Sequence, residues 1–312
     1  MKNVSVLDSV YLYLKIDLAL SFSLFAWRSI KTTENWFDVI LFYFGIKKQT
    51  KVVFRNKQVL ENLTVDSYPI YRNIQELLLL GLPSDAEFVE IKFRGHKVLL
   101  KGDEAPFLTS EIFFDEAYKH SNPDGKDVVD IGANIGDSAI YFVLRGAKHV
   151  YGFEPYSYVY KTALENTKLN RFEDKITMLN SAIGDKDGTI ILNPETQSFV
   201  GSDLKASAKG DPVSLITLEN VVNQFKIKDG LLKIDCEGSE YQILFSTPNE
   251  VLRNFNEIIL EYHYGYLDLK NKLEQAGFSV KMLGFPVRRY NPHASNSRMT
   301  VGVLHAKRKL PN

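Results

Sequence analysis

Residues 127–137 read Asp-Val-Val-Asp-Ile-Gly-Ala-Asn-Ile-Gly-Asp, and this stretch decides the fold that we expect for the rest of the chain. Its first five residues are mainly apolar, which is typical of a short buried strand. A glycine-rich turn occupies 132–136, and residues 138–144 have the composition of a helix. Strand, glycine turn and helix in this order predict the beginning of a βαβ unit.

The same rhythm continues toward the C-terminus. Further apolar strands are expected at 149–153, 175–183, 231–235 and 257–262, with a helix at 158–169 between the first two. Strands that alternate with helices indicate a parallel sheet with helices on both faces. The predicted fold class is therefore α/β, a doubly wound and mainly parallel sheet. Ligands of such sheets lie beyond the carboxyl ends of the strands, where the strand order reverses.

The first part of the chain has other patterns. Bulky residues at helical spacing indicate that the first 65 residues are helical, as in Leu12, Ile16, Leu20, Leu24 and Trp27, then Trp36, Ile40 and Phe44. Short helices are expected at 73–80 and 111–120, and a β-hairpin around Arg94-Gly95-His96. We expect a helical appendage of unknown role at 1–87, a hairpin and helix packed on the catalytic domain at 88–122, and the main domain at 123–312.

Composition narrows the setting. The chain has 38 Lys and Arg against 38 Asp and Glu, so its net charge is zero, which argues against charge-driven disorder and against wholesale binding of a phosphate backbone. Its one cysteine, Cys236, cannot form an internal disulfide. A reducing, cytoplasmic location is the expectation.

Two apolar stretches near the N-terminus bear on membrane contact. Leu18–Trp27 and Val39–Ile46 are free of charge over ten and eight residues, whereas a spanning helix needs about 20. We therefore expect no transmembrane span and no secretory signal peptide. Buried helices are the favoured interpretation of both stretches, and peripheral membrane contact through residues 10–46 is left open.

The glycine turn predicts which ligand the sheet binds. A dinucleotide site has a second glycine where this chain has Asn134, and the Asn134 side chain would crowd a pyrophosphate. No Gly-Lys-Ser/Thr follows, so a P-loop is excluded. A nucleoside ligand without phosphates fits better, namely S-adenosylmethionine. The residues of this turn assigned to the cofactor are Asp130, Gly132, Ala133, Asn134 and Gly136.

Two further strand ends are expected to complete the cofactor site. Glu154 lies 22 residues after Gly132, close to the spacing of about 20 for an acid that accepts from both ribose hydroxyls. Pro155 is expected to hold this turn rigid, and the ring of Tyr156 to lie on the adenine. After the third strand, Ser181 and Ala182 are assigned to the adenine edge with Asn180 beside them, although a plain turn explains the segment nearly as well.

The fourth and fifth strands end in ionisable residues. Side-chain alternation places Lys233, Asp235 and Glu237 on one face of the fourth strand and Cys236 on the other. Two carboxylates on one face need a cation or a proton between them. The next strand carries Glu261 and His263. Asp235, Glu237 and His263 are the candidate catalytic residues; these three with Glu261 could instead hold a divalent cation such as Mg²⁺. Spacing alone does not decide between a proton relay and a metal.

The ordered motifs resemble one family. They are the segment 130–137, Gly-Phe-Glu-Pro at 152–155, Ala-Ile-Gly-Asp at 182–185, Thr-Leu-Glu at 217–219, Lys-Ile-Asp-Cys-Glu-Gly-Ser-Glu at 233–240 and Leu-Glu-Tyr-His at 260–263. Together they resemble the FkbM family of class I, S-adenosylmethionine-dependent methyltransferases over residues 88–283. The resemblance implies methyl transfer to oxygen, with Asp130–Gly136 and Glu154 at cofactor positions. It also implies that Asp235 and Glu237 lie beside the acceptor and that His263 is the strand-end histidine.

The expected function is therefore O-methylation of a hydroxyl on a sugar, glycan or small-molecule acceptor. His263 or Asp235 is expected to accept the hydroxyl proton, while Glu237 orients the acceptor or an ion. Two alternatives stay open. The basic segment 281–312 could bind RNA, which would make the chain an RNA methyltransferase, although nucleic acid is the less favoured partner. The chain could also be a cofactor-binding scaffold without activity. The acceptor and the oligomeric state do not follow from the sequence.

Overall fold

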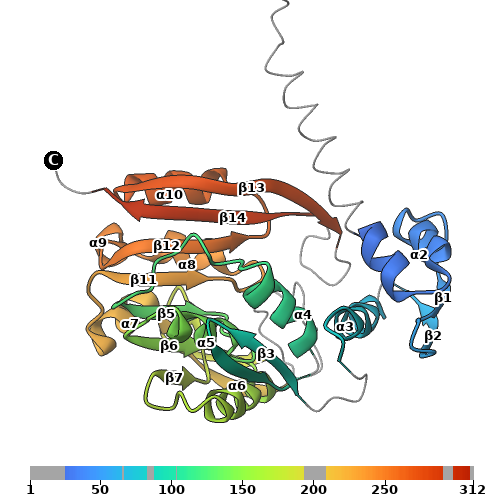
Figure 1. The fold of residues 1–312 in the computed structure, drawn as a ribbon. Helices are drawn as coiled ribbons and strands as arrows, with labels where there is room; N and C mark the ends of the chain where they lie inside the picture. Colours follow the sequence, from blue (N-terminus) through green and yellow to red (C-terminus); the bar gives the residue numbers. More distant parts are fainter. Residues whose placement is uncertain are drawn as a thin grey trace, which may run out of the picture. The chain divides into compact units, whose positions relative to one another are not determined.

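The computed structural model describes residues 25–64, 67–82, 88–102, 104–192, 209–290 and 298–309 (Figure 1). The chain divides into two compact units. An N-terminal unit comprises Met1–Val89 and Asp103–Ser110, and a larger unit comprises Glu90–Gly102 and Glu111–Asn312. The expected division of the chain at residues 87 and 122 stays a prediction.

The N-terminal unit mixes helices with a pair of strands. Its elements are a helix at 25–32, α2 (Trp36–Tyr43), β1 (Thr50–Val53), β2 (Val59–Leu63), α3 (Tyr68–Leu79) and α4 (Ala105–Thr109). The side chains of Val39, Val52, Phe54 and Tyr71 pack in one buried cluster. The expectation of helix throughout the first 65 residues is wrong at 50–63, where β1 and β2 pair antiparallel. The expected helical positions 12–24 lie outside the described residues.

The two short helices expected next differ in their outcome. The helix expected at 73–80 is present as α3, which begins earlier because a proline in its first turn starts the helix at Tyr68. The helix expected at 111–120 is wrong. The chain instead forms α4, continues as a π-helical turn at Ser110–Phe114, and stops at Glu116, whose φ of +49° is left-handed.

The hairpin at the beginning of the larger unit is confirmed. β3 (Val89–Phe93) and β4 (His96–Leu100) pair in a two-stranded sheet. Arg94 and Gly95 between them both have positive φ, +50° and +83°. This is the conformation of a type I′ turn, which matches the twist of the two strands.

The larger unit contains the expected doubly wound sheet. Its described residues form seven strands in the order β13-β14-β12-β11-β5-β6-β7. Five are parallel, and β14 and β13 close one edge antiparallel. Their bounds are β5 (Asp127–Ile131), β6 (His149–Phe153), β7 (Ile176–Leu179), β11 (Gly230–Ile234), β12 (Phe255–Tyr262), β13 (Phe278–Tyr290) and β14 (Arg298–Arg308). The chain order reverses between β5 and β11, so the ligand edge lies at their carboxyl ends.

The strand expected at 175–183 is wrong as a single element. It is divided at Asn180 into β7 and β8 (Ser181–Gly184), and β8 leaves the central sheet. β8 pairs with β10 (Asp211–Thr217), which pairs with β9 (Gly188–Leu192). The side-chain hydrogen bonds of Asn180, described below, hold the chain at this change of direction.

Helices cover the sheet because its strands are apolar on both faces. α5 (Asp137–Leu144) contacts β5, β6 and β7, and α6 (Ser157–Leu169) contacts β7 (Figure 1). A second cluster joins strand residues such as Ile131, Leu232 and Ile234 to the remaining helices. These helices are α7 (Leu218–Phe225), α8 (Glu240–Ser246), α9 (Asn249–Leu252) and α10 (Leu267–Gln275).

The length of the helices also bears on membranes. Within the described ranges, every helix is too short or too polar to cross a bilayer.

Candidate active site

The glycine turn after β5 has the backbone that its sequence predicts. Gly132, Asn134 and Gly136 have φ of +76°, +46° and +84°, a region that glycine enters freely and asparagine tolerates. A Cβ atom at Gly132 would lie 1.8 Å from the carbonyl oxygen of Asp235. The missing side chain therefore allows the end of β5 to approach the end of β11, which brings the cofactor turn and the acidic segment together.

Glu154 closes this turn from the end of β6. Its side chain is only 6% exposed, and its Oε2 accepts the Asn134 N–H at 3.1 Å while Oε1 accepts the Tyr156 N–H at 3.0 Å. Burial raises the pKa of Glu154 to about 7, and the two backbone donors oppose that rise. Each carboxylate oxygen can accept a second hydrogen bond. Glu154 is thus fixed at the end of β6 with room for further hydrogen bonds, and its contact with the ribose stays a prediction.

Asn180 fixes the turn that carries Glu154. Its Nδ2 donates to the carbonyl oxygens of Glu154 and Pro155 at 3.0 and 2.9 Å, and its Oδ1 accepts from Ser157 Oγ at 3.1 Å. The neighbouring Ser181 is buried, and its hydroxyl donates to the carbonyl of Ser214 at 2.9 Å.

The adenine contacts expected of Ser181 and Ala182 stay predictions. Both residues are buried in β8, whose pairing with β10 already uses the Ser181 hydroxyl. The structure assigns Asn180 a different and positioning part, because all its polar side-chain atoms are bonded to the turn at Glu154. The expected placement of the Tyr156 ring on adenine and the rigidity expected of Pro155 also stay predictions.

A buried ion pair connects β5 to β11. Lys233 and Asp130 are register partners on the parallel strands, and the Lys233 Nζ lies 3.0 Å from Asp130 Oδ1 with exposures of 2% and 0%. Nζ also donates to the carbonyl of Gly132 at 2.6 Å, and Ser138 Oγ donates to Asp130 Oδ2 at 2.6 Å. Burial alone would lower the pKa of Lys233, but Asp130 and Asp235 outweigh it and raise the pKa. Through this pair Asp130 supports the glycine turn, and its predicted contact with the cofactor stays a prediction.

Asp235, Glu237 and His263 come together as predicted. One ligand atom of each lies within 4.8 Å of the others. Simple strand alternation does not explain this, because β11 ends at Ile234 and Glu237 has a left-handed φ of +56°. His263 is 2% exposed, whereas Glu237 is 31% exposed and Asp235 is half-buried. The two carboxylates are thus the members of the group that a ligand can reach. Glu261 lies outside this group.

Glu240 is a site residue that the predictions omit. Its fully buried carboxylate accepts the N–H groups of Cys236 and Gly238 at 3.1 and 2.9 Å and lies 2.9 Å from His263 Nδ1. It therefore holds both the loop that carries Glu237 and the histidine. Its place directly after the loop at 236–239 is the signal that could have identified it, since a carboxylate there can accept the backbone N–H groups of that loop.

His263 is clamped between two carboxylates. Its Nε2 lies 3.1 Å from Glu237 Oε2, and its Nδ1 bonds Glu240. Burial alone would lower the pKa of His263, but the contacts with Glu237 and Glu240 raise it to about 12. The imidazole is therefore a cation at neutral pH, and in that form it has no free lone pair for a proton or a metal.

Two neighbours complete the acidic end of β11. The Tyr118 hydroxyl donates to Asp235 Oδ2 at 3.2 Å, and burial, with Asp235 next, raises the pKa of Tyr118 well above its usual value. The phenol therefore stays protonated and orients the carboxylate. Burial also raises the pKa of the Cys236 thiol, so it remains neutral, in agreement with its prediction as a small apolar residue.

Two oxygens at the glycine turn test whether the cofactor fits. Asn134 Oδ1 and Asp137 Oδ1 are buried and have no hydrogen-bond partner within the described part of the chain. Burial raises the pKa of Asp137 to about 7, and nearby Lys233 opposes this. Unsatisfied buried acceptors are rare, and a ligand that brings N–H donors would satisfy them. The amino group of S-adenosylmethionine is such a donor, so the residues present fit this cofactor.

The basic C-terminal segment is partly occupied by internal contacts. Arg308 pairs with Asp229 through NH2 and donates to the carbonyl of Arg253, and the Lys307 Nζ lies 3.8 Å from Glu257. The side chains of the other arginines of this segment lie outside the described residues, so the RNA alternative stays a prediction.

The strand order, the glycine turn and the acid at the end of β6 define the class of α/β domains that bind a nucleoside at the switch point of the sheet. Residues 130–280 match the model of the family described as Methyltransferase FkbM domain. This part of the chain therefore belongs to the FkbM methyltransferase family.

A curated protein and several solved structures are also similar to this chain. Ribosomal protein L11 methyltransferase of Carboxydothermus hydrogenoformans is 36% identical over 74 residues, which is 24% of either chain. The chain thus spans about a quarter of that relative's length. The solved structure of TYW2 of P. horikoshii in complex with MeSAdo is 16% identical, with a TM-score of 0.40, over 80% of this chain and 88% of that chain. The solved structure of TYW2 of M. jannaschii in complex with AdoMet is 18% identical, with a TM-score of 0.37, over 73% of this chain and 90% of that chain.

Proposed function

We propose that this protein is an S-adenosylmethionine-dependent methyltransferase that methylates a hydroxyl oxygen of a sugar, glycan or other small polyol. The observation that carries the cofactor part is Glu154, a buried carboxylate fixed by the N–H groups of Asn134 and Tyr156 at the switch point of the sheet. The unsatisfied oxygens of Asn134 and Asp137 beside it support the same ligand.

The acceptor part rests on the two reachable carboxylates. Asp235 and Glu237 lie at the carboxyl end of β11, next to the glycine turn, and both are partly exposed. Ionised carboxylates only accept hydrogen bonds, so they recognise hydroxyl groups and repel phosphates. This charge favours a polyol acceptor over a nucleic acid. A cytoplasmic location is part of the proposal.

The side chains of the site can be assigned separate roles in methyl transfer. The bound cofactor supplies an electrophilic methyl group, and the protein must hold the acceptor oxygen in line with it. Asp235, oriented by Tyr118, takes the proton of the acceptor hydroxyl, because its half-buried carboxylate is within reach of a ligand. Glu237 holds a neighbouring hydroxyl, and its carboxylate is positioned by the contact of Oε2 with His263 Nε2 at 3.1 Å. The base role predicted for His263 is the weaker assignment, since both ring nitrogens are occupied.

A divalent ion has little support from this donor set. His263 would have to lose its proton and its contact with Glu237 before Nε2 could bind a metal. No step of the proposal therefore uses a metal.

The cofactor is tested by calorimetric titration of S-adenosylmethionine into the wild type and Glu154→Ala. Binding should weaken at least tenfold in the variant, which corresponds to about 1.4 kcal/mol. Glu274→Gln is the matched control, because that carboxylate lies on the exposed face of α10 beside Lys270. Absence of binding to folded wild type would refute the proposal and favour a scaffold without activity.

The acceptor is tested by mass spectrometry of methyl transfer to a panel of monosaccharides and oligosaccharides, with transfer RNA as the competing class. Asp235→Asn should abolish turnover of the acceptor while S-adenosylmethionine still binds. Methylation of RNA, or of no polyol, would refute the acceptor class. Loss of sugar methylation in EDTA, restored by Mg²⁺, would instead assign Asp235 and Glu237 to a metal.

A further inference from the structure

Helix α2 in the N-terminal unit is apolar nearly all round. Its sequence, Trp-Phe-Asp-Val-Ile-Leu-Phe-Tyr, has one charged residue in eight. Val39 and Ile40 are buried in the core of the unit, as a helix of a water-soluble unit requires. The opposite face is also apolar, and a helix without a polar face is normally buried in protein or in lipid.

The outward face of α2 carries a continuous apolar stripe. Phe37, Leu41 and Phe44 follow one another at helical spacing, and Phe37 and Phe44 are 59% and 57% exposed. Ile46, 69% exposed, continues the stripe, because its backbone N–H bonds the carbonyl of Leu41 at 2.9 Å. We call Phe37, Leu41, Phe44 and Ile46 the α2 stripe. The sequence favoured burial of the stretch 39–46, and the exposure of Phe44 and Ile46 contradicts it.

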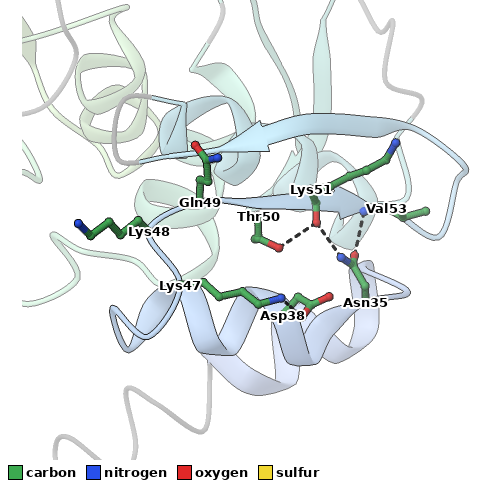
Figure 2. A pocket seen from close by; sticks show the side chains of 8 residues that line it. All are labelled: Asn35, Asp38, Lys47, Lys48, Gln49, Thr50, Lys51 and Val53. Carbon is green, nitrogen blue, oxygen red and sulfur yellow. Dashed lines mark hydrogen bonds and ion pairs between the residues drawn. The ribbon is translucent and has the colours of Figure 1, made fainter.

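Basic residues begin where the α2 stripe ends. Lys47, Lys48 and Lys51 line a shallow hollow of about 850 Å³ between the end of α2 and β1, together with Asn35, Gln49 and Thr50 (Figure 2). Lys47 pairs with Asp38 in this hollow and Lys51 pairs with Glu61 at 2.9 Å, whereas the ammonium end of Lys48 points outward from the rim (Figure 2). Residues 25–64 hold seven basic and three acidic residues, while the whole chain is neutral.

This combination identifies one kind of occupant. Aromatic and aliphatic side chains beside lysines are what a surface helix needs to insert into the headgroup region of an anionic bilayer. A second copy of the same surface would instead bring surplus positive charge against like charge. We infer that the α2 stripe, with the lysines at its end, docks the protein on an anionic lipid surface. This inference rests on the N-terminal unit alone and does not depend on the proposed methyl transfer.

The test is co-sedimentation of the full chain with vesicles of phosphatidylcholine containing about 30% phosphatidylserine, compared with pure phosphatidylcholine. The wild type should bind the anionic vesicles, and added salt should weaken binding. The triple variant Phe37→Ser/Phe44→Ser/Ile46→Ser should bind at least tenfold more weakly. Lys48→Gln/Lys51→Gln should lose affinity for the anionic vesicles only.

The matched control is Leu267→Ser, which removes a side chain that is 64% exposed on α10 of the larger unit and should bind as the wild type does. Circular dichroism verifies folding, and Ile46→Ser alone decides if the triple variant does not fold. Wild type that stays in the supernatant, or triple variant that binds equally well, would overturn the inference. So would a wild-type dimer that the triple variant dissociates while neither protein binds vesicles, because the α2 stripe would then cover a second copy.

Discussion

Replacing His263 by glutamine should remove a large part of the pH dependence of stability. In the folded chain the pKa of His263 is raised to about 12 by its contacts with Glu237 and Glu240, whereas an unfolded histidine titrates near 6.5. The sign follows from the raised value. The stability that the His263 cation contributes is fully present below pH 6.5 and is lost as the pH rises toward 12, because only the unfolded chain releases the proton over this range.

The size of the expected change in the free energy of unfolding depends only on the pKa of His263 in the folded chain being above about 10. Between pH 7 and pH 9 the folded protein keeps its proton on His263 and the unfolded chain has largely lost it, so the free energy of unfolding falls by about 1.36 kcal/mol per pH unit. Allowing for the fraction already released at pH 7, the wild type should lose about 2.5 kcal/mol more than His263→Gln. Groups that do not contact His263 contribute equally to both proteins and cancel.

The assay is urea unfolding of both proteins at pH 7 and pH 9 in EDTA. Far-UV circular dichroism follows the larger unit, while fluorescence of Trp27 and Trp36, the two tryptophans of the chain, follows the N-terminal unit as an internal control. A difference below about 0.5 kcal/mol between the two pH dependences would show that His263 titrates normally. It would then be available as a base, contrary to the assignment to Asp235.

Three further predictions concern the cofactor turn. Gly132→Ala should lower the free energy of unfolding by about 3 kcal/mol or more, because the new Cβ would lie 1.8 Å from the Asp235 carbonyl oxygen and the backbone φ is +76°. A free energy of unfolding within about 1 kcal/mol of the wild-type value, measured in denaturant, would contradict this prediction. Lys233→Met should lower the free energy of unfolding by about 3–5 kcal/mol, since it leaves Asp130 buried without a cation. Adding Asp130→Asn to this variant should restore part of the loss. Equal stability of the single and double variants would refute this explanation. Because burial raises the pKa of Glu154 and of Asp137 to about 7, calorimetry should find S-adenosylmethionine bound at least about tenfold more weakly at pH 6 than at pH 8, and Glu154→Gln should show a smaller dependence, since only Asp137 then contributes. Parallel pH profiles of the two proteins would rule out an ionised Glu154 as the ribose acceptor.

The predictions from sequence were most accurate where one residue type has one physical reason to be present. The glycine turn at 132–136, the strand at 149–153 and the hairpin at Arg94-Gly95 all depend on local backbone conformation or short-range alternation, and all three are present. The helices expected across 50–63 and at 111–120 failed for a related reason. Apolar spacing over short stretches does not distinguish helix from strand, and the left-handed Glu116 and the pairing of β1 with β2 decided the outcome.

The candidate acidic residues were identified correctly as a group, but for an incomplete reason. Asp235 and Glu237 were placed on one face on the assumption that strand alternation continues past residue 234. In the structure, the left-handed backbone at Glu237 and the hydrogen bonds of the buried Glu240 bring the loop to His263 instead. Glu240 was omitted because its partners lie both near it in sequence and 23 residues away. The protonation of His263 could not be predicted either, since it depends on two carboxylates that only the packed loop brings to the ring.

The sequence by itself therefore determined the class of the larger unit and the residues that follow its strands β5, β6, β11 and β12. Glycine conformation and strand period are local properties, whereas the strand order, and with it the switch point between β5 and β11, came from the structure. Only the tertiary structure decided what these residues do to each other: that Asp130 is neutralised by Lys233, that His263 is a clamped cation, and that the α2 stripe is exposed. Burial and charge pairing depend on atoms that the fold brings together from distant parts of the chain. A local sequence pattern therefore cannot predict them.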